Sequence, residues 1–155
     1  MNNVKWPLLF VCGCAIVLLA TSTGGNYWLV VDGASEGLWM YCPGNSKCRP
    51  FNLPLGTLKN KMQATRAFAI LAILSSLAAG VLTLLGFFSE KVKGTFVSVF
   101  AGGAAVCMII ALAIFTDLTS DITKSKLINY GWSYILGWVG VFGTFNSCIL
   151  GFFAK

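Results

Sequence analysis

The chain has 155 residues, of which 57% are hydrophobic and 10% are charged, and its formal net charge is +6. Soluble domains carry about 25% charged residues, so this composition excludes an ordinary water-soluble domain and indicates one membrane-embedded unit. The basic residues are scattered over loops and ends instead of forming a continuous patch, which argues against a nucleic-acid-binding protein. The chain contains no histidine, the commonest general base and metal ligand.

Four apolar stretches without a charged residue follow one another along the chain, at residues 6–23, 67–88, 95–115 and 132–154. Each has roughly the 17–25 residues that a spanning helix needs. We therefore predict one domain, residues 1–155, with four transmembrane helices and with loops 24–66 and 116–131 on the same side. The first stretch also resembles a signal peptide, but we favour a retained helix because four helices close a bundle better than three.

The orientation depends on two features. Lys91 and Lys93 lie in the short turn between the second and third stretches, which favours a cytoplasmic turn, although the other side holds more basic residues in total. Cys42 and Cys48 lie in the long first loop, and stable disulfides form outside the cytoplasm. Together these features predict that both termini lie in the cytoplasm and that the long first loop lies outside the cell.

The six cysteines divide by location. Cys42 and Cys48 flank a Pro-Gly-Asn turn that is typical of a hairpin tip, and they are either bridged or free thiols. A metal site is disfavoured because no further Cys or His lies nearby. The other four lie in apolar stretches and are expected to act as small hydrophobic residues; palmitoylation of Cys12 or Cys14 is the alternative.

The first loop contains three strand candidates, at residues 27–31, 37–42 and 48–51. Three antiparallel strands with an apolar face can form a small sheet above the membrane. Trp28 and Trp39 are its expected packing anchors, with contact to lipid headgroups as the alternative.

Little in the sequence indicates chemistry. GASEG, residues 33–37, matches the Gly-x-Ser-x-Gly pattern of hydrolases, but without a histidine base we interpret it as a β-turn. We expect no enzyme activity, no cofactor and no metal. The few polar residues in the apolar stretches argue against a transporter. Asn146 is one of them, and we expect its amide to be buried and to contribute to bundle stability.

Several motifs together resemble a known family. Trp28, the triplet Gly37-Leu38-Trp39, and then Cys42 and Cys48 resemble the signature of the claudin, peripheral myelin protein and epithelial membrane protein superfamily. QATRAF and WSYILGWV further along also match that family, most closely its lens fibre members and next its epithelial members.

The resemblance implies a fold and a function. The fold would be a left-handed bundle of four transmembrane helices under a small extracellular antiparallel sheet, with a Cys42–Cys48 bridge joining two strands. Family members act in cell–cell adhesion and junction organisation, and none is known as an enzyme. We therefore expect a structural tetraspan protein of the lens fibre type, a multi-pass protein of the plasma membrane at cell–cell contacts. The alternatives are a claudin-like paracellular barrier or pore, and an auxiliary subunit of a channel or receptor.

The expected partners are the lipid bilayer and a like protein in the same or the opposing membrane, as a homo-oligomer. Lys47 and Arg49 are the candidate contact surface. Arg66 is expected to fix the sheet to the bundle through backbone carbonyls, with an interfacial anchor as the alternative. The sequence ends in Phe-Phe-Ala-Lys, so we expect no PDZ scaffold partner.

Overall fold

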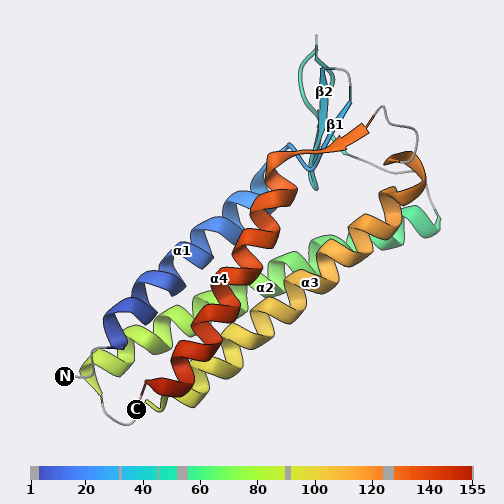
Figure 1. Cartoon of the computed structure of the whole chain (residues 1–155). Helices are drawn as coiled ribbons and strands as arrows, with labels where there is room; N and C mark the ends of the chain where they lie inside the picture. Colours follow the sequence, from blue (N-terminus) through green and yellow to red (C-terminus); the bar gives the residue numbers. More distant parts are fainter. Residues whose placement is uncertain are drawn as a thin grey trace.

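The computed structural model describes residues 4–31, 33–44, 46–51, 56–89, 92–123 and 128–154, without the side chains of 121–123. Four long helices run side by side, and a small sheet lies beyond one end of them (Figure 1). The helices are α1 (Lys5–Gly24), α2 (Thr57–Phe88), α3 (Gly94–Thr123) and α4 (Trp132–Phe153). We call the end next to the sheet the sheet end, and the other, where both termini lie, the terminal end.

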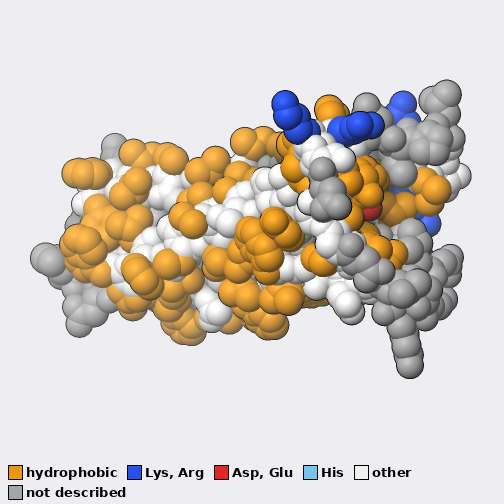
Figure 2. Space-filling model, turned by 90° about the horizontal axis from the view of Figure 1, so that it is seen from above, with side chains coloured by type: hydrophobic (Ala, Val, Ile, Leu, Met, Phe, Trp, Pro, Cys, Tyr) orange, Lys and Arg blue, Asp and Glu red, His pale blue; other side chains and the backbone are white. Residues whose placement is uncertain are grey.

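The four helices are each long and apolar enough to cross a membrane, which confirms the predicted spans. The reason is visible on the surface: hydrophobic side chains cover most of the bundle, whereas the visible Lys and Arg side chains gather at one end, around the sheet (Figure 2). Lipid, and not water, therefore suits the outside of the bundle.

Small residues allow the helices to approach closely. A Cβ atom added to Gly143 of α4 would lie 3.1 Å from the Cβ of Ala15 on α1, and one added to Gly140 would lie 2.7 Å from Leu19. Gly102 of α3 similarly faces the sulfur of Cys148, at 3.3 Å. Gly102, Gly140 and Gly143 therefore lie at helix contacts, where small residues permit close packing.

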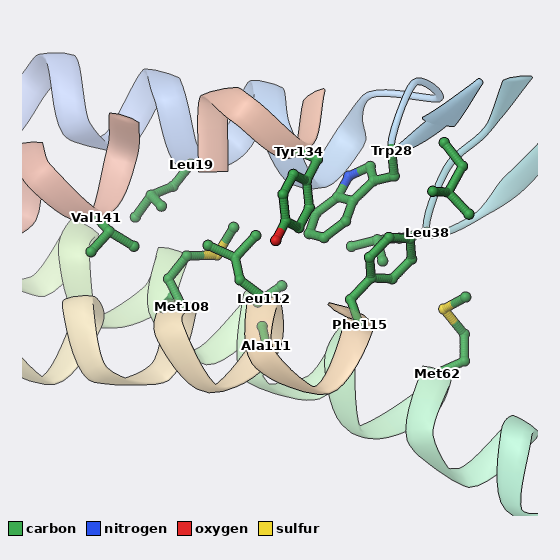
Figure 3. Packing of buried hydrophobic residues seen from close by; sticks show 13 residues of the cluster. Leu19, Trp28, Leu38, Met62, Met108, Ala111, Leu112, Phe115, Tyr134 and Val141 are labelled. Carbon is green, nitrogen blue, oxygen red and sulfur yellow. The ribbon is translucent and has the colours of Figure 1, made fainter. Parts of the chain in front are cut away.

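The largest buried cluster lies toward the sheet end of the bundle and contains three aromatic rings (Figure 3). Trp28 is fully buried. Its ring centre lies 4.8 Å from that of Phe115 and 5.8 Å from that of Tyr134, in edge-to-face arrangements. Such pairs add to the stability that burial alone supplies. The first loop, α3 and α4 thus share one core.

The sheet has five strands in the order β4-β3-β2-β1-β5, all antiparallel. They are β1 (Leu29–Val31), β2 (Ala34–Glu36), β3 (Met40–Cys42), β4 (Arg49–Pro50) and β5 (Ile128–Tyr130). Three of them fall within the predicted strands. β5 comes from the predicted second loop, residues 116–131, and completes the sheet beside β1.

The GASEG motif does not form the β-turn that we expected. Its central residues make up β2. Ser35 is a buried residue of this strand and pairs with Val30 on one side and Cys42 on the other. A nucleophile elbow needs a turn from a strand into a helix. Ser35 therefore has a structural position in the middle of the sheet.

Two helices extend beyond their predicted bounds. α2 begins at Thr57 instead of residue 67, and α3 ends at Thr123 instead of residue 115, so parts of both predicted loops are helical. The prediction followed the apolar stretches, which mark the membrane span and not the helix. The added turns of α2 are amphipathic, because Met62 and Thr65 are buried at helical spacing.

Asn146 contradicts the expectation of a buried amide, because its side chain is exposed. The helical period explains this position. The face of α4 that packs on its neighbours carries Gly140, Gly143, Thr144 and Ser147, and Asn146 falls outside that set. Replacing it is therefore not expected to disturb the packing of the bundle itself.

The apolar cysteines differ in exposure. Cys12 is buried, with its sulfur 3.9 Å from the hydroxyl oxygen of Thr83, whereas Cys14 is exposed on the lipid-facing side. If either of the two were palmitoylated, the exposed thiol of Cys14 would be the accessible one.

Candidate functional site

The two tryptophans of the first loop join the sheet to the end of α1. The indole N–H of Trp28 donates to the carbonyl of Ser22 at 2.7 Å, and that of Trp39 donates to the carbonyl of Thr23 at 2.9 Å. The last carbonyls of a helix have no partner within the helix. The indole of Trp39 therefore gives the carbonyl of Thr23 a partner, and the indole of Trp28 is a second donor to the carbonyl of Ser22, which also accepts from the N–H of Gly25 at 3.3 Å.

The two tryptophans lie at different depths. Trp28 is fully buried in the core, whereas Trp39 is 39% exposed. The backbone N–H of Trp28 also donates to the carbonyl of Glu36 at 2.8 Å, which ties the start of the loop to β2. Trp28 thus packs inside the core, and Trp39 lies at the edge of the core.

Gly37 allows the sheet to approach α1 closely. A Cβ atom at this position would lie 2.7 Å from both the Cα of Asn26 and the carbonyl oxygen of Gly25. Both are backbone atoms, which cannot rotate away as a flexible side chain can. The next residue, Leu38, is fully buried in the core. Each member of the Gly-Leu-Trp triplet therefore has a different role at this junction: Gly37 permits the close approach, Leu38 fills the core, and Trp39 donates a hydrogen bond to the end of α1.

Arg66, near the sheet end of α2, contacts the first loop at three points. Its Nε donates to the carbonyl of Leu38 at 2.6 Å, and its Nη2 donates to the carbonyl of Phe51 at 3.0 Å. The guanidinium carbon lies 5.1 Å from the ring centre of Trp39, within the range of a cation–π contact. The planar fork of donors thus meets two carbonyls and a ring at once.

The hairpin of β3 and β4 is closed by a disulfide between Cys42 and Cys48, as the resemblance implied, with their Cα atoms 4.1 Å apart. Tyr41 pairs with Arg49 directly beside it. Lys47 and Arg49 are both exposed, on either side of Cys48. The bridge therefore holds two cationic side chains at the outer edge of the sheet.

The charges at the sheet end are mostly positive (Figure 2). Lys61 of α2 forms an ion pair with Asp117 of α3, whose side chain is 66% exposed. Lys47 and Arg49 form no ion pair with any residue that the structure describes. Among the described residues, these two cations therefore have no acidic partner.

Glu36 of β2 is a feature that sequence reasoning missed. Directly paired residues of antiparallel strands share a face, and Glu36 lies between Leu29 and Tyr41 in such a row. Burial raises the pKa of its carboxyl group above the ordinary value of 4.5. No hydrogen bond or ion pair joins it to another side chain in the described ranges. A prediction that residues 34–36 form a strand would have placed Glu36 in the same row as Leu29.

No group of three or more His, Cys, Asp or Glu residues lies close enough to hold a metal ion within the described ranges. The junction contacts thus join the sheet to the bundle, and Lys47 and Arg49 are exposed on the hairpin. A match to the PMP-22/EMP/MP20/Claudin family covers residues 5–151.

The chain belongs to this family. Among its relatives, the human lens fiber membrane intrinsic protein is 32% identical over 141 residues, which cover 86% of this chain and 79% of the relative. Human epithelial membrane protein 2 is 31% identical over 140 residues, covering 84% and 83%. Human epithelial membrane protein 1 is 28% identical over 131 residues, covering 80% and 79%.

The family assignment fits the architecture and the predicted resemblance. As a member of the PMP-22/EMP/MP20/Claudin family, the chain is a multi-pass membrane protein with four spanning helices. Of the residues that carried the resemblance, Trp28 and the Gly-Leu-Trp triplet gather where the sheet meets the bundle, and the cysteine pair closes the β3–β4 hairpin.

Proposed function

We propose that this PMP-22/claudin-family protein is a structural tetraspan of cell–cell contacts, and not an enzyme, whose sheet end binds a like protein in the opposing membrane. One observation carries the proposal: Lys47 and Arg49 are exposed, lack ion-pair partners in the described ranges, and lie on a hairpin closed by a disulfide. The lens and epithelial names of its relatives support a role in tissues with closely apposed membranes.

The proposed orientation places the sheet end outside the cell and both termini in the cytoplasm. A disulfide persists in oxidising compartments, and the Cys42–Cys48 bridge belongs to the sheet end. Lys93 is exposed close to the start of α3, at the terminal end, and short loops with lysine favour the cytoplasmic side. The bridge and Lys93 therefore support the same orientation.

The contact would act through side chains instead of strand pairing. β4 is an edge strand of the sheet, but Pro50 lacks the N–H that a new neighbouring strand would need. A pre-ordered hairpin loses little conformational entropy on binding, and its cations steer the approach of an acidic surface. In a like protein, the exposed carboxylate of Asp117 is an acidic group of the described sheet end.

Cell aggregation tests this proposal. Cells that express the parent protein should aggregate above mock-transfected cells, and the double variant Lys47→Glu with Arg49→Glu should lose most of that aggregation. Lys93→Glu is the control, because it also replaces an exposed cation by glutamate, but at the terminal end, and it should aggregate like the parent. Parent cells that display the protein at the surface without aggregating would refute the proposal.

The same two cations favour a second candidate, a claudin-like paracellular barrier or pore. Exposed like charges along a passage select ions of opposite sign, so Lys47 and Arg49 would favour anions. An epithelial layer expressing the protein should then show a changed transepithelial resistance with preference for anions, reversed in the double Glu variant. Unchanged resistance and selectivity would exclude this candidate.

A further inference from the structure

Asn146 is an unusual residue for a lipid-facing position. Its side chain is exposed on α4, and nearby exposed residues on that helix are Phe142, Phe145 and Ile149. The amide nitrogen donates to the carbonyl of Phe142 at 2.8 Å, one turn earlier. The amide oxygen accepts no hydrogen bond from any residue that the structure describes.

The depth of Asn146 makes this exposure costly. It lies seven residues before Phe153, the last residue of α4, which at the helical rise is about 10 Å from the terminal end. The 22 residues of α4 span about 33 Å, close to the thickness of the hydrocarbon core. The short Asn side chain therefore cannot extend to water, and lipid tails offer no donor or acceptor.

We propose that the lipid-facing side of α4 at Asn146 binds a second copy of this chain within the same membrane, with the two Asn146 amides hydrogen-bonded to each other. The carboxamide contains both a donor and an acceptor, so it is complementary to itself. A two-fold symmetric contact brings each residue near the axis against its own copy. One symmetric contact thus pairs both amides, and interhelical bonds of this kind are known to join membrane helices.

The aromatic neighbours suit the same occupant. Phe142 and Phe145 are 65% and 56% exposed; Phe142 lies one turn before Asn146 on the lipid-facing surface, and Phe145 directly precedes it in the chain. Their rings would cover the amide pair and exclude headgroups and water from it. This contact is lateral and lies within the membrane, so it goes beyond the adhesive contact proposed for the sheet end and does not depend on it.

Association in lipid vesicles tests the proposal. The full-length protein, labelled in separate batches with donor and acceptor dyes, is reconstituted at decreasing protein-to-lipid ratios, and energy transfer gives the dimer fraction. Asn146→Leu should weaken dimerisation roughly tenfold. Asn146→Gln keeps the amide and should retain most of the dimer. Val106→Leu, at a 56% exposed position of α3, is the control for a change on another lipid-facing side.

A cysteine cross-link locates the contact independently. In a Cys14→Ala background, Asn146→Cys should form a covalent dimer on mild oxidation in vesicles, whereas Val99→Cys on α3 should not. Melting temperatures near that of the parent would show that these lipid-facing variants still fold. A parent that stays monomeric, an Asn146→Leu variant that dimerises like the parent, or equal cross-linking at both positions would each overturn the proposal. Aggregation assays with Asn146→Leu report on adhesion separately.

Discussion

The guanidinium group of Arg66 lies over the indole ring of Trp39, 5.1 Å from its centre, while the indole N–H of Trp39 donates to the carbonyl of Thr23. One ring therefore connects the end of α1 with α2. Arg66 also donates to the carbonyl of Phe51, and the N–H of Phe51 donates to the carbonyl of Trp39 at 2.8 Å. Losing any one of these groups should loosen contacts made by the others.

Arg66→Lys should lower the free energy of unfolding by about 1–2 kcal/mol, because a single ammonium group cannot meet both carbonyls and the ring in the same geometry. Thermal melting in detergent or lipid measures the change. Arg49→Lys makes the same chemical replacement at an exposed position and should melt like the parent. If the two variants have the same melting temperature, Arg66 acts only as an interfacial anchor.

Gly37→Ala should destabilise the protein by about 1–3 kcal/mol, since the new methyl group would meet two backbone atoms at 2.7 Å. The expected readout is a lower melting temperature together with weaker surface expression. Gly103→Ala is the matched control, because no atom lies within 4 Å of the added methyl group and alanine favours the helix. Equal effects of the two substitutions would show that the close approach of the sheet is not limiting.

Removal of the Cys42–Cys48 disulfide should destabilise the sheet while the four helices stay in place. A bridge that closes so short a loop contributes about 2 kcal/mol on the chain-entropy model. The double variant Cys42→Ser with Cys48→Ser should keep its helical circular dichroism but lose aggregation and part of its surface expression. Cys107→Ser, which removes a free thiol in α3, should do neither. A double variant with normal trafficking and adhesion would show that the bridge is dispensable.

Glu36→Gln should raise the melting temperature at neutral pH. Because burial raises the pKa of Glu36 in the folded protein, the carboxyl group contributes its full stability below the ordinary value of 4.5 and loses it as the pH rises through the raised pKa. The gain from glutamine should therefore disappear well below pH 4.5. Asp117→Asn removes the partner of Lys61 and should give no such gain. A gain that is independent of pH would contradict this account.

The membrane spans and the identity of the hairpin could be predicted from the sequence, because each depends on neighbouring residues. An uncharged stretch of about 20 residues crosses a membrane whatever surrounds it. Two cysteines around a Pro-Gly-Asn turn likewise indicate a hairpin without knowledge of the rest of the fold. The family signature is local in the same sense, and the match over residues 5–151 confirms it.

The strands were harder to predict, because three residues are too few to show an alternating pattern. β5 pairs with β1 through Leu29 and Tyr130, residues that lie about a hundred positions apart in the chain. Nothing in the short stretch around Tyr130 indicates that a strand edge is available to it. The polar ends of α2 and α3 were missed for a related reason, since they pack against residues distant in the chain, as Met62 does in the core cluster.

The amino-acid sequence by itself therefore determined which segments are apolar enough to enter the membrane and which loop carries the cysteine hairpin, because these properties follow from local composition and spacing. The bridge between the two cysteines was implied by the family resemblance. Only the tertiary structure decided which way each side chain faces. Asn146 is exposed to lipid and Glu36 is half-buried because their orientation depends on the helices and strands packed beside them. A single stretch of sequence does not specify those neighbours.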